Sequence, residues 1–362
     1  MDKNNTIFLD HAAAAPVNRA AADFYRAALI EDFANQEALH FLAYEGRRKI
    51  AAAAEMVVRR LTGTDDYEVV WGDSATELSG LIGGYLSGRK VVSSYLEHPA
   101  VTANLKASCQ LCEIGCSRRG ELLPEKTDKV SAVVIHRVQS ELGVIQDTEK
   151  IFASYPRALK ITDAVQAAGK LPWSADADIN IISGVKFGAP GGAALLVKKN
   201  CPETEKFLTF AEEYRKKYYR MSRIHTATVR SFAFALDMAE ERREREFERI
   251  SDLQQKLVGY LSEFGVYPTL PEGSRTSCYI THFLLKKMQG AVVVRALSEY
   301  GICVGSGSAC ASESASPSAA LRAIGVERDS LYGGLRVSVG EATTEDEIKI
   351  FADKLNFVLK NY

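Results

Sequence analysis

The stretch from residue 179 to residue 197 contains one charged side chain, Lys186, between an apolar strand pattern and a turn rich in Gly and Pro. Apolar surroundings disfavour an ammonium ion, so we expect the pKa of this lysine to be lowered. A neutral amine in such a place can add to a carbonyl group and form a Schiff base. Lys186 therefore predicts covalent chemistry on a carbonyl compound.

A carboxylate and an amide follow another apolar strand pattern, in "KITDAVQAAGK". Asp163 comes directly after the strand, and a carboxylate there needs a partner such as a protonated ring nitrogen. Gln166 lies on the same side of the chain if a helical turn follows. A helix cap is the alternative role for Asp163.

Two further segments place polar groups just beyond strand patterns. In "WGDSATELSGL" the backbone N–H groups of Ala75 and Thr76 open a helix and suit a phosphate, although Ser and Thr also cap many helices that bind no ligand. In "SSYLEHPAV" His98 could stack on an aromatic cofactor and move protons, or have a structural role only. A phosphate cradle, an acid for a pyridinium, a Schiff-base lysine and a stacking histidine are together the parts of a pyridoxal phosphate (PLP) site, in which the cofactor supplies the electron sink.

Six β-rich runs alternate with helical stretches and predict the elements that would position these groups. The runs are mostly apolar on both faces, which is typical of a largely parallel sheet covered by helices. Ligands of such sheets gather beyond the carboxyl ends of the strands, where the four segments lie. The six runs are residues 67–72, 90–95, 130–137, 158–163, 177–183 and 193–199.

Helical patterns and a second set of strands indicate a smaller C-terminal domain. Residues 46–63 predict an Ala-rich helix that stops at Gly63. Residues 227–264 predict a long charged helix that connects the large domain to the smaller one. In the smaller domain, strand patterns cover residues 277–285 and 334–340, and helical patterns cover 291–301 and 344–361.

The composition is that of a soluble globular protein of two domains, with 362 residues, 46% apolar and 25% charged, and a formal net charge of −1. This charge gives no reason to expect binding to nucleic acid or to a membrane surface. The N-terminus lacks the apolar core of a secretion signal, and no apolar run is long enough to span a bilayer. We therefore expect a cytoplasmic protein whose seven cysteines are thiols.

The cysteines fall into two kinds of context. Cys109, Cys112 and Cys116 have the spacing C-x-x-C-x-x-x-C, which admits a metal or iron–sulfur site. The apolar alternation between Cys112 and Cys116 instead favours the buried face of a strand, and we expect no metal. Cys310 lies in the Gly-, Ser- and Ala-rich run of residues 301–318, which can hardly form a helix or strand and gives the thiol no neighbouring metal ligand.

Nearly the whole chain resembles the class V group of the fold type I PLP enzymes, and within that group it is most similar to the cysteine desulfurases. The most specific match is "GSGSACASESASPSAALRAIG" at residues 305–325. The other matching segments are "FLDHAAAAPVN" at 8–18, "SATE" at 74–77, "LEHPAV" at 96–101, "SELGVIQD" at 140–147, "TDAVQAAGKLP" at 162–172, "SGVKFGAPGG" at 183–192 and "LRVSVGEATTEDEI" at 335–348.

The resemblance implies an α/β fold of two domains in a homodimer. Residues 15–245 would form the large PLP-binding domain around a mostly parallel sheet of seven strands. Residues 1–14 and 246–362 would form a smaller α+β domain, which carries Cys310 on a loop of about residues 303–318.

The resemblance also implies the role of each cofactor residue. Lys186 would carry PLP as a Schiff base, His98 would lie over the ring, Asp163 would contact the pyridine nitrogen and Gln166 the phenolic oxygen. The phosphate would be bound by Ala75, Thr76 and Ser183, and by Thr226 from a second subunit.

On the substrate side, the resemblance implies that Arg336 holds the carboxylate of L-cysteine, as a guanidinium fork suits. Lys186 would take the α-proton, and the Cys310 thiolate would attack the substrate sulfur. The products would be alanine and a persulfide on Cys310, and the sulfur would pass to an acceptor protein for iron–sulfur cluster assembly or tRNA thiolation. A flexible loop lets one thiol reach both the substrate and the acceptor.

Three positions depart from the family pattern. Val185 replaces the usual histidine that binds phosphate, Ser140 replaces an asparagine near the substrate carboxylate, and His11 stands where asparagine is common. Each changes a hydrogen bond worth on the order of 1 kcal/mol or more. Two alternatives to cysteine desulfurase therefore stay open: a selenocysteine lyase or related PLP β-lyase, and a homologue that has lost catalysis and acts as a binding partner.

Overall fold

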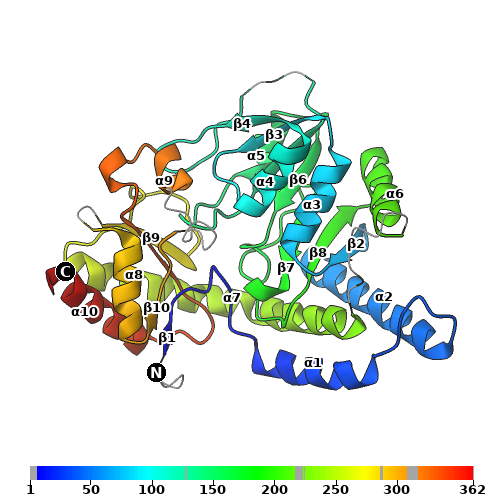
Figure 1. Cartoon of the computed structure of the whole chain (residues 1–362), viewed down its shortest axis with the longest axis horizontal. Helices are drawn as coiled ribbons and strands as arrows, with labels where there is room; N and C mark the ends of the chain where they lie inside the picture. Colours follow the sequence, from blue (N-terminus) through cyan, green and yellow to red (C-terminus); the bar gives the residue numbers. More distant parts are fainter. Residues whose placement is uncertain are drawn as a thin grey trace.

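A mixed sheet of seven strands lies at the centre of the molecule, which is described here from a computed structural model (Figure 1). The structure describes residues 6–125, 127, 129–216, 223, 225–285, 288–307 and 317–361. The strand order is β2-β8-β7-β6-β5-β3-β4, and β8 is antiparallel to both of its neighbours while the other pairs are parallel. The strands are β2 (Tyr67–Gly72), β3 (Lys90–Ser94), β4 (Gln110–Ile114), β5 (Ala132–His136), β6 (Leu159–Asp163), β7 (Ile179–Ser183) and β8 (Ala193–Lys198). The expected fold class is confirmed, and six of these strands coincide with the six predicted runs.

Helices cover both faces of the sheet because alternate strand residues enter two separate cores. Ile182 packs with residues of α2 (Phe41–Thr62) and α7 (Thr226–Glu263), whereas its neighbour Ile181 packs with residues of α3 (Ala75–Tyr85), α4 (Pro99–Ser108) and α6 (Pro202–Lys216). α1 (Arg19–Glu31) packs against α7, and α5 (Thr148–Ala153) contributes to a third apolar cluster. Gly63 ends α2 with a φ of +69°, as the sequence predicts.

The smaller part of the molecule lies around two short sheets. β9 (Ile280–Leu284) pairs with β11 (Gly334–Ser338) in antiparallel fashion, and β1 (Ile7–Phe8) pairs with β10 (Ile302–Cys303) in parallel. The remaining elements are α8 (Gly290–Glu299), α9 (Ala319–Ala323), a 3-10 turn at Arg328–Ser330 and α10 (Glu345–Asn361).

The 38 residues of α7 connect the two parts of the molecule. Its packing partners include α1 and α2 on one side and α10 on the other. The helix runs through residue 245 without a break, so the proposed boundary between residues 245 and 246 falls inside a regular element. The division into residues 15–245 and 1–14 with 246–362 stays a prediction.

The thiols at Cys109, Cys112 and Cys116 are free. Cys112 lies in β4, which agrees with the strand interpretation of this segment. Within the described ranges, no group of three or more His, Cys, Asp or Glu side chains could hold a metal ion. Across the same ranges, none of the helices is both long enough and apolar enough to cross a membrane.

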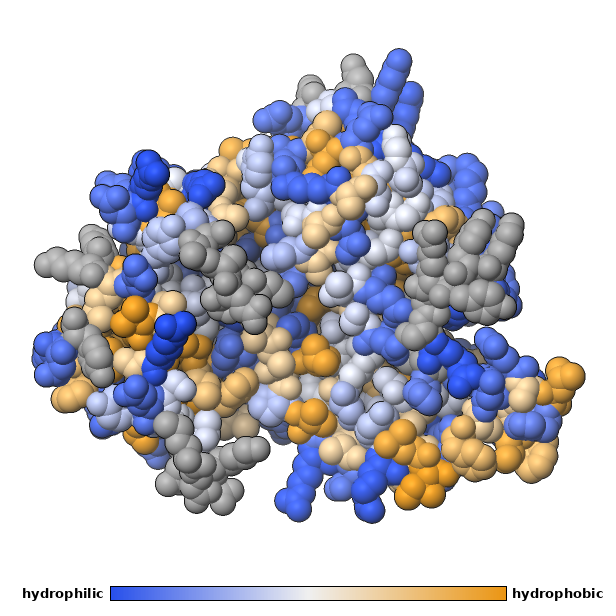
Figure 2. All heavy atoms as spheres, viewed as in Figure 1, coloured by the Kyte–Doolittle hydropathy of each residue, from blue (hydrophilic) through white to orange (hydrophobic). Residues whose placement is uncertain are grey.

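Large apolar side chains are exposed where α1 ends and α2 begins. We call this surface the α1–α2 patch; it consists of Ile30, Phe33, Leu39, Phe41 and Tyr44, which are 72%, 72%, 100%, 74% and 57% exposed. Figure 2 shows apolar side chains gathered at the lower right, where Figure 1 places the connection between the two helices. Exposed apolar surfaces of this kind occur at contact sites for other macromolecules, so the α1–α2 patch is a candidate interface.

Candidate active site

A cavity of about 280 Å³ lies beyond the carboxyl ends of the parallel strands. Such a place is expected for a ligand site in an α/β sheet. Nine of the predicted site residues line this cavity: Ala75, Thr76, His98, Ser140, Asp163, Gln166, Ser183, Lys186 and Arg336. The fold therefore brings together side chains that are spread over most of the sequence.

Lys186 ends a one-turn 3-10 helix, Gly184–Lys186, directly after β7. Its Nζ donates to the carbonyl oxygen of Ala12 at 3.0 Å and to that of Ala13. Both carbonyls belong to the N-terminal segment, which forms one wall of the cavity. The amine is thus held at the cavity wall, and the expected lowering of its pKa stays a prediction.

Asp163 is the last residue of β6 and faces the cavity. One carboxylate oxygen accepts a hydrogen bond from the backbone N–H of Val165 at 2.9 Å, so the capping role considered for this residue is partly met. Burial raises the pKa of Asp163 to about 6, and the negative charge of Glu97 adds to the shift. A protonated ring nitrogen against this carboxyl group would offset the cost of its ionisation.

Gln166 lies on the helical turn after β6, as the sequence predicts. Its Nε2 donates to the carbonyl oxygen of Ala12 at 2.8 Å, and its Oε1 accepts from Nζ of Lys170 at 3.4 Å. These two contacts fix the orientation of the amide, because only Nε2 can donate and only Oε1 can accept. The second hydrogen of Nε2 remains available for another acceptor, and Gln166 lines the cavity.

The N-terminus of α3 has the donors that the expected phosphate cradle requires, and phosphate binding there stays a prediction. Ser74 caps the helix, since its Oγ accepts from the backbone N–H of Glu77 at 3.1 Å. The first N–H groups of a helix have no partner within the helix, so those of Ala75 and Thr76 can serve an anion, and Ser183 adds a hydroxyl at the end of β7. Val185 also lines the cavity, with an apolar side chain where the family places a histidine.

His98 caps α4 while its ring borders the cavity. Its Nδ1 accepts a hydrogen bond from the backbone N–H of Ala100 at 3.1 Å. Burial lowers the pKa of His98, and the positive charges of Lys186 and Arg336 lower it further. The ring is therefore neutral with its proton on Nε2, a form that can stack on an aromatic ring.

Arg336, which is expected to hold the substrate carboxylate, lines the cavity and is almost fully buried. Its Nη2 donates to Asp10 at 2.7 Å, and its Nη1 donates to the backbone oxygen of Ser140 at 2.9 Å. Its Nε is buried and has no hydrogen-bond partner among the described residues. A guanidinium has five N–H donors, so three remain for a carboxylate.

Sequence reasoning missed a buried network behind Asp163. The His136 side chain is in register with Asp163 across β5 and β6, and its Nδ1 lies 2.7 Å from the Glu97 carboxylate. Gln146 donates from Nε2 to the backbone oxygen of Gly120, and the same Nε2 lies 3.2 Å from Nε2 of His136. That nitrogen of His136 must then accept, so Nδ1 carries the proton and donates to Glu97. No spacing rule connects these residues, although Glu97 is adjacent to His98.

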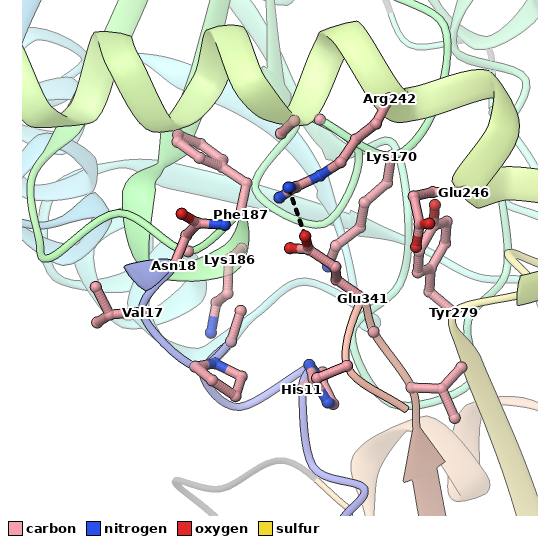
Figure 3. A pocket seen from close by; sticks show the side chains of 18 of the residues that line it. His11, Val17, Asn18, Lys170, Lys186, Phe187, Arg242, Glu246, Tyr279 and Glu341 are labelled. Carbon is pink, nitrogen blue, oxygen red and sulfur yellow. Dashed lines mark hydrogen bonds and ion pairs between the residues drawn. The ribbon is translucent and has the colours of Figure 1, made fainter. Parts of the chain in front are cut away.

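Two of the predicted residues that the structure describes are not among those lining the cavity. His11 lines a neighbouring cavity of about 400 Å³, where burial and then the charge of Lys170 lower its pKa to about 4 (Figure 3). Thr226 is buried at the start of α7 and accepts a hydrogen bond from Gln36 at 3.1 Å. Cys310 lies outside the described residues.

The comparison with known families places the chain and its fold in one class. The pattern of the family "Aminotransferase class-V" matches residues 7–351, and the chain belongs to this family. Its structure has the fold of the fold type I PLP enzymes: a NifS-like protein superimposes over 99% of this chain and 100% of its own with a TM-score of 0.84 at 21% identity. The apo cysteine desulfurase of Thermococcus onnurineus NA1 covers 99% and 96% of the two chains with a TM-score of 0.80 at 17% identity.

Within the family, cysteine desulfurases are among the similar sequences. The cysteine desulfurase IscS of Anaeromyxobacter sp. (strain Fw109-5) is 27% identical over 94% of this chain and 89% of the relative. The human cysteine desulfurase is 25% identical over 96% of this chain and 80% of the relative. The chain is therefore desulfurase-like along its whole length.

Proposed function

We propose that this chain is a PLP-dependent L-cysteine desulfurase that forms a persulfide on Cys310. The observation that carries the proposal is the single cavity in which Lys186, Asp163, His98 and Arg336 meet the N-terminus of α3. The desulfurase relatives support the choice of substrate within the class V family.

The residues present fit PLP. The α3 N-terminus with Ser183 suits the phosphate, the half-buried Asp163 suits a protonated ring nitrogen, and Lys186 is the amine that would bind the aldehyde carbon. The neutral ring of His98 would cover one face of the cofactor, and Nε2 of Gln166 would donate toward its phenolic oxygen. When bound, the cofactor supplies an electron sink for the substrate α-carbon.

The protein residues divide the remaining work. Arg336 would hold the substrate carboxylate with donors that Asp10 and Ser140 leave available. The Lys186 amine would act as a general base and take the proton from the substrate α-carbon. The carbonyls of Ala12 and Ala13 would stabilise the resulting ammonium group, because they are already within its reach.

Cys310 would complete the reaction. Its thiolate attacks the substrate sulfur, the new S–S bond forms as the Cβ–S bond breaks, and the carbon takes up a proton. The sum is L-cysteine plus the Cys310 thiol giving L-alanine plus the Cys310 persulfide. A sulfur-acceptor protein would then take the terminal sulfur for iron–sulfur cluster assembly or thiolation.

We further propose a cytoplasmic homodimer that uses the α1–α2 patch. Gln36, which donates to Thr226, lies in the segment between Phe33 and Leu39 of this patch. The patch therefore lies beside the buried Thr226, so a subunit docked on the patch would come close to this residue, as the prediction for Thr226 requires. Light scattering of the purified chain checks the dimer.

Mass spectrometry after the addition of cysteine tests the function. We expect the peptide with Cys310 to gain the mass of one sulfur atom, and we expect alanine to form with excess thiol as reductant. Cys310→Ser should abolish both results, whereas the control Cys303→Ser should keep them. Full alanine production by Cys310→Ser would contradict the persulfide mechanism.

Cys310→Ser and borohydride reduction together test the two alternatives raised by Val185, Ser140 and His11. A selenocysteine lyase or a related β-lyase does not need the loop thiol, so it would retain turnover in Cys310→Ser on its own substrate. A homologue without catalysis would not retain PLP on Lys186 after borohydride reduction. The retained arrangement of Lys186, Asp163 and His98 in one cavity favours catalysis.

A further inference from the structure

A second lysine lies close behind the catalytic one. Lys170 follows Gln166 by four residues on the turn after β6, and its side chain is buried. Lys170 and Lys186 both line the neighbouring cavity of about 400 Å³, and Figure 3 shows both side chains extending into it. Lys186 lines the cofactor cavity as well, so it lies on the wall between the two cavities.

A continuous set of hydrogen bonds connects the two amines. Nζ of Lys170 donates to Oε1 of Gln166 at 3.4 Å, and Nε2 of Gln166 donates to the carbonyl oxygen of Ala12 at 2.8 Å. The same carbonyl oxygen accepts from Nζ of Lys186 at 3.0 Å. Loss of the Lys170 side chain would therefore alter the hydrogen bonds of the Gln166 amide, and through the Ala12 carbonyl those of Lys186.

The carboxylates of this cavity do not neutralise Lys170. Glu341 pairs with Arg242, which Figure 3 shows as a dashed line, and Glu246 pairs with Arg249. Nζ of Lys170 donates a long hydrogen bond, of 3.4 Å, to Oε1 of Gln166. A buried ammonium ion with so little compensation is costly.

The other groups that face Lys170 are neutral or positively charged. The ring centroid of Tyr279 lies 5.7 Å from its Nζ, and Cys278 and His11 are the remaining titratable neighbours. Burial and then the charge of Lys186 lower the pKa of Lys170 to about 7, against a smaller opposing effect of Cys278. When two like charges interact strongly in a buried site, protonation of one disfavours protonation of the other, and the two groups titrate as a coupled pair.

We propose that Lys170 is a positioning residue for Lys186: it orients the Gln166 amide, and it competes with Lys186 for a single proton. The Lys186 amine is then neutral in a larger share of molecules and can add to the cofactor aldehyde. The benefit of this role for catalysis rests on the proposed function. The proton coupling itself is a property of the protein without PLP and can be tested in that form.

Trace acetylation of the full-length protein without PLP tests the proposal. Acetic anhydride acylates only neutral amines, so peptide mass spectrometry across a pH series gives a midpoint for each lysine. The exposed Lys349 serves as the internal reference. In Lys170→Met we expect the midpoint of Lys186 to rise by about one pH unit, because a like charge has been removed. Lys170→Arg keeps the charge and should leave the midpoint at or below that of the wild type.

The reciprocal variant guards against a folding defect in Lys170→Met. Coupling between two sites is mutual, so Lys186→Ala should raise the midpoint of Lys170 by the same amount. An unchanged midpoint in both variants, or equal shifts in Lys170→Met and Lys170→Arg, would overturn the proposal. PLP attachment to Lys186 is scored separately by borohydride reduction, so failure of the proposed function gives a different result.

Discussion

The cofactor side and the substrate side of the cavity are built in different ways. On the cofactor side, Asp163 and Gln166 come from one strand and its following turn, and Ser183 and Lys186 come from another. On the substrate side, Arg336 depends on Asp10, which is 326 residues away, and on Ser140, which is 196 residues away. Local segments fix the cofactor side, whereas the whole fold must be correct for the substrate side. We therefore expect some substitutions to impair cofactor binding without changing substrate binding, and others to do the reverse.

Of the substitutions considered, Lys186→Ala should reduce turnover most, because it should abolish the function of the cofactor side of the cavity. Loss of a positioned general base costs on the order of 10²–10⁴ in rate, and loss of covalent attachment adds to this. We expect alanine formation to fall by at least this factor and PLP to dissociate on gel filtration. The surface variant Lys349→Ala is the control, and turnover within tenfold of the wild type in Lys186→Ala would contradict the assigned role.

Asp163→Asn should change how stability depends on pH in the protein without cofactor. The pKa of Asp163 is raised from 3.8 to about 6, so between these values the folded state binds more protons than the unfolded state. Stability of the wild type is therefore lost as pH rises through this window, by on the order of 3 kcal/mol. Urea unfolding should show that Asp163→Asn gains this much relative to the wild type between about pH 4 and about pH 7.

Two observations control the Asp163 experiment. PLP should remove the difference at neutral pH, because its ring nitrogen would pair with the carboxylate of the wild type only. Parallel stability curves for the wild type and Asp163→Asn would show that the carboxyl group is not protonated in the folded protein, and the pairing argument would fail.

Arg336→Lys tests the substrate side through the KM for L-cysteine. A lysine keeps the charge but loses the fork, and a lost hydrogen bond to a charged group costs about 1.5–3 kcal/mol. We expect KM for L-cysteine to rise about 10–100-fold, with a smaller change in kcat and unchanged PLP binding. Asp10→Asn, which keeps an acceptor beside Arg336, should show a smaller rise. Equal KM values for Arg336→Lys and the wild type would remove Arg336 from the substrate site.

Val185→His should give the smallest effect and acts on the cofactor side alone. The new imidazole would restore a phosphate ligand worth about 1 kcal/mol, which is about a fivefold gain in PLP affinity. Equilibrium dialysis measures this gain, and Val185→Ala is the control that adds no donor. An unchanged affinity would show that the α3 N-terminus and Ser183 already satisfy the phosphate.

The sequence predicts the local parts of this protein well and the long-range parts poorly. Six strands, the end of α2 at Gly63 and the long helix α7 follow from periodicity and caps. The nine predicted residues among those lining the cavity follow from strand-end motifs and from the resemblance to desulfurases. The Asp10–Arg336 pair could not be predicted, because it needs the register of β11 and the path of the N-terminal segment together.

The network around His136 and the position of Lys170 show the same limit. Both depend on which face of a strand or turn becomes buried, and an isolated His or Lys gives no such signal. His11 is instructive, since a motif match suggests a substrate contact while the structure places the ring in the neighbouring cavity. Gly340 allows this placement, because a Cβ there would lie 2.3 Å from Nδ1 of His11.

The path of the first described residues has a consequence for biosynthesis. β1 pairs with β10, and the chain just after it supplies the Ala12 and Ala13 carbonyls at the centre of the site. Residues translated early thus wait for partners that are translated much later. The large sheet lies between them in the sequence and can form on the nascent chain first, so the cavity would close only after β10 has been synthesised.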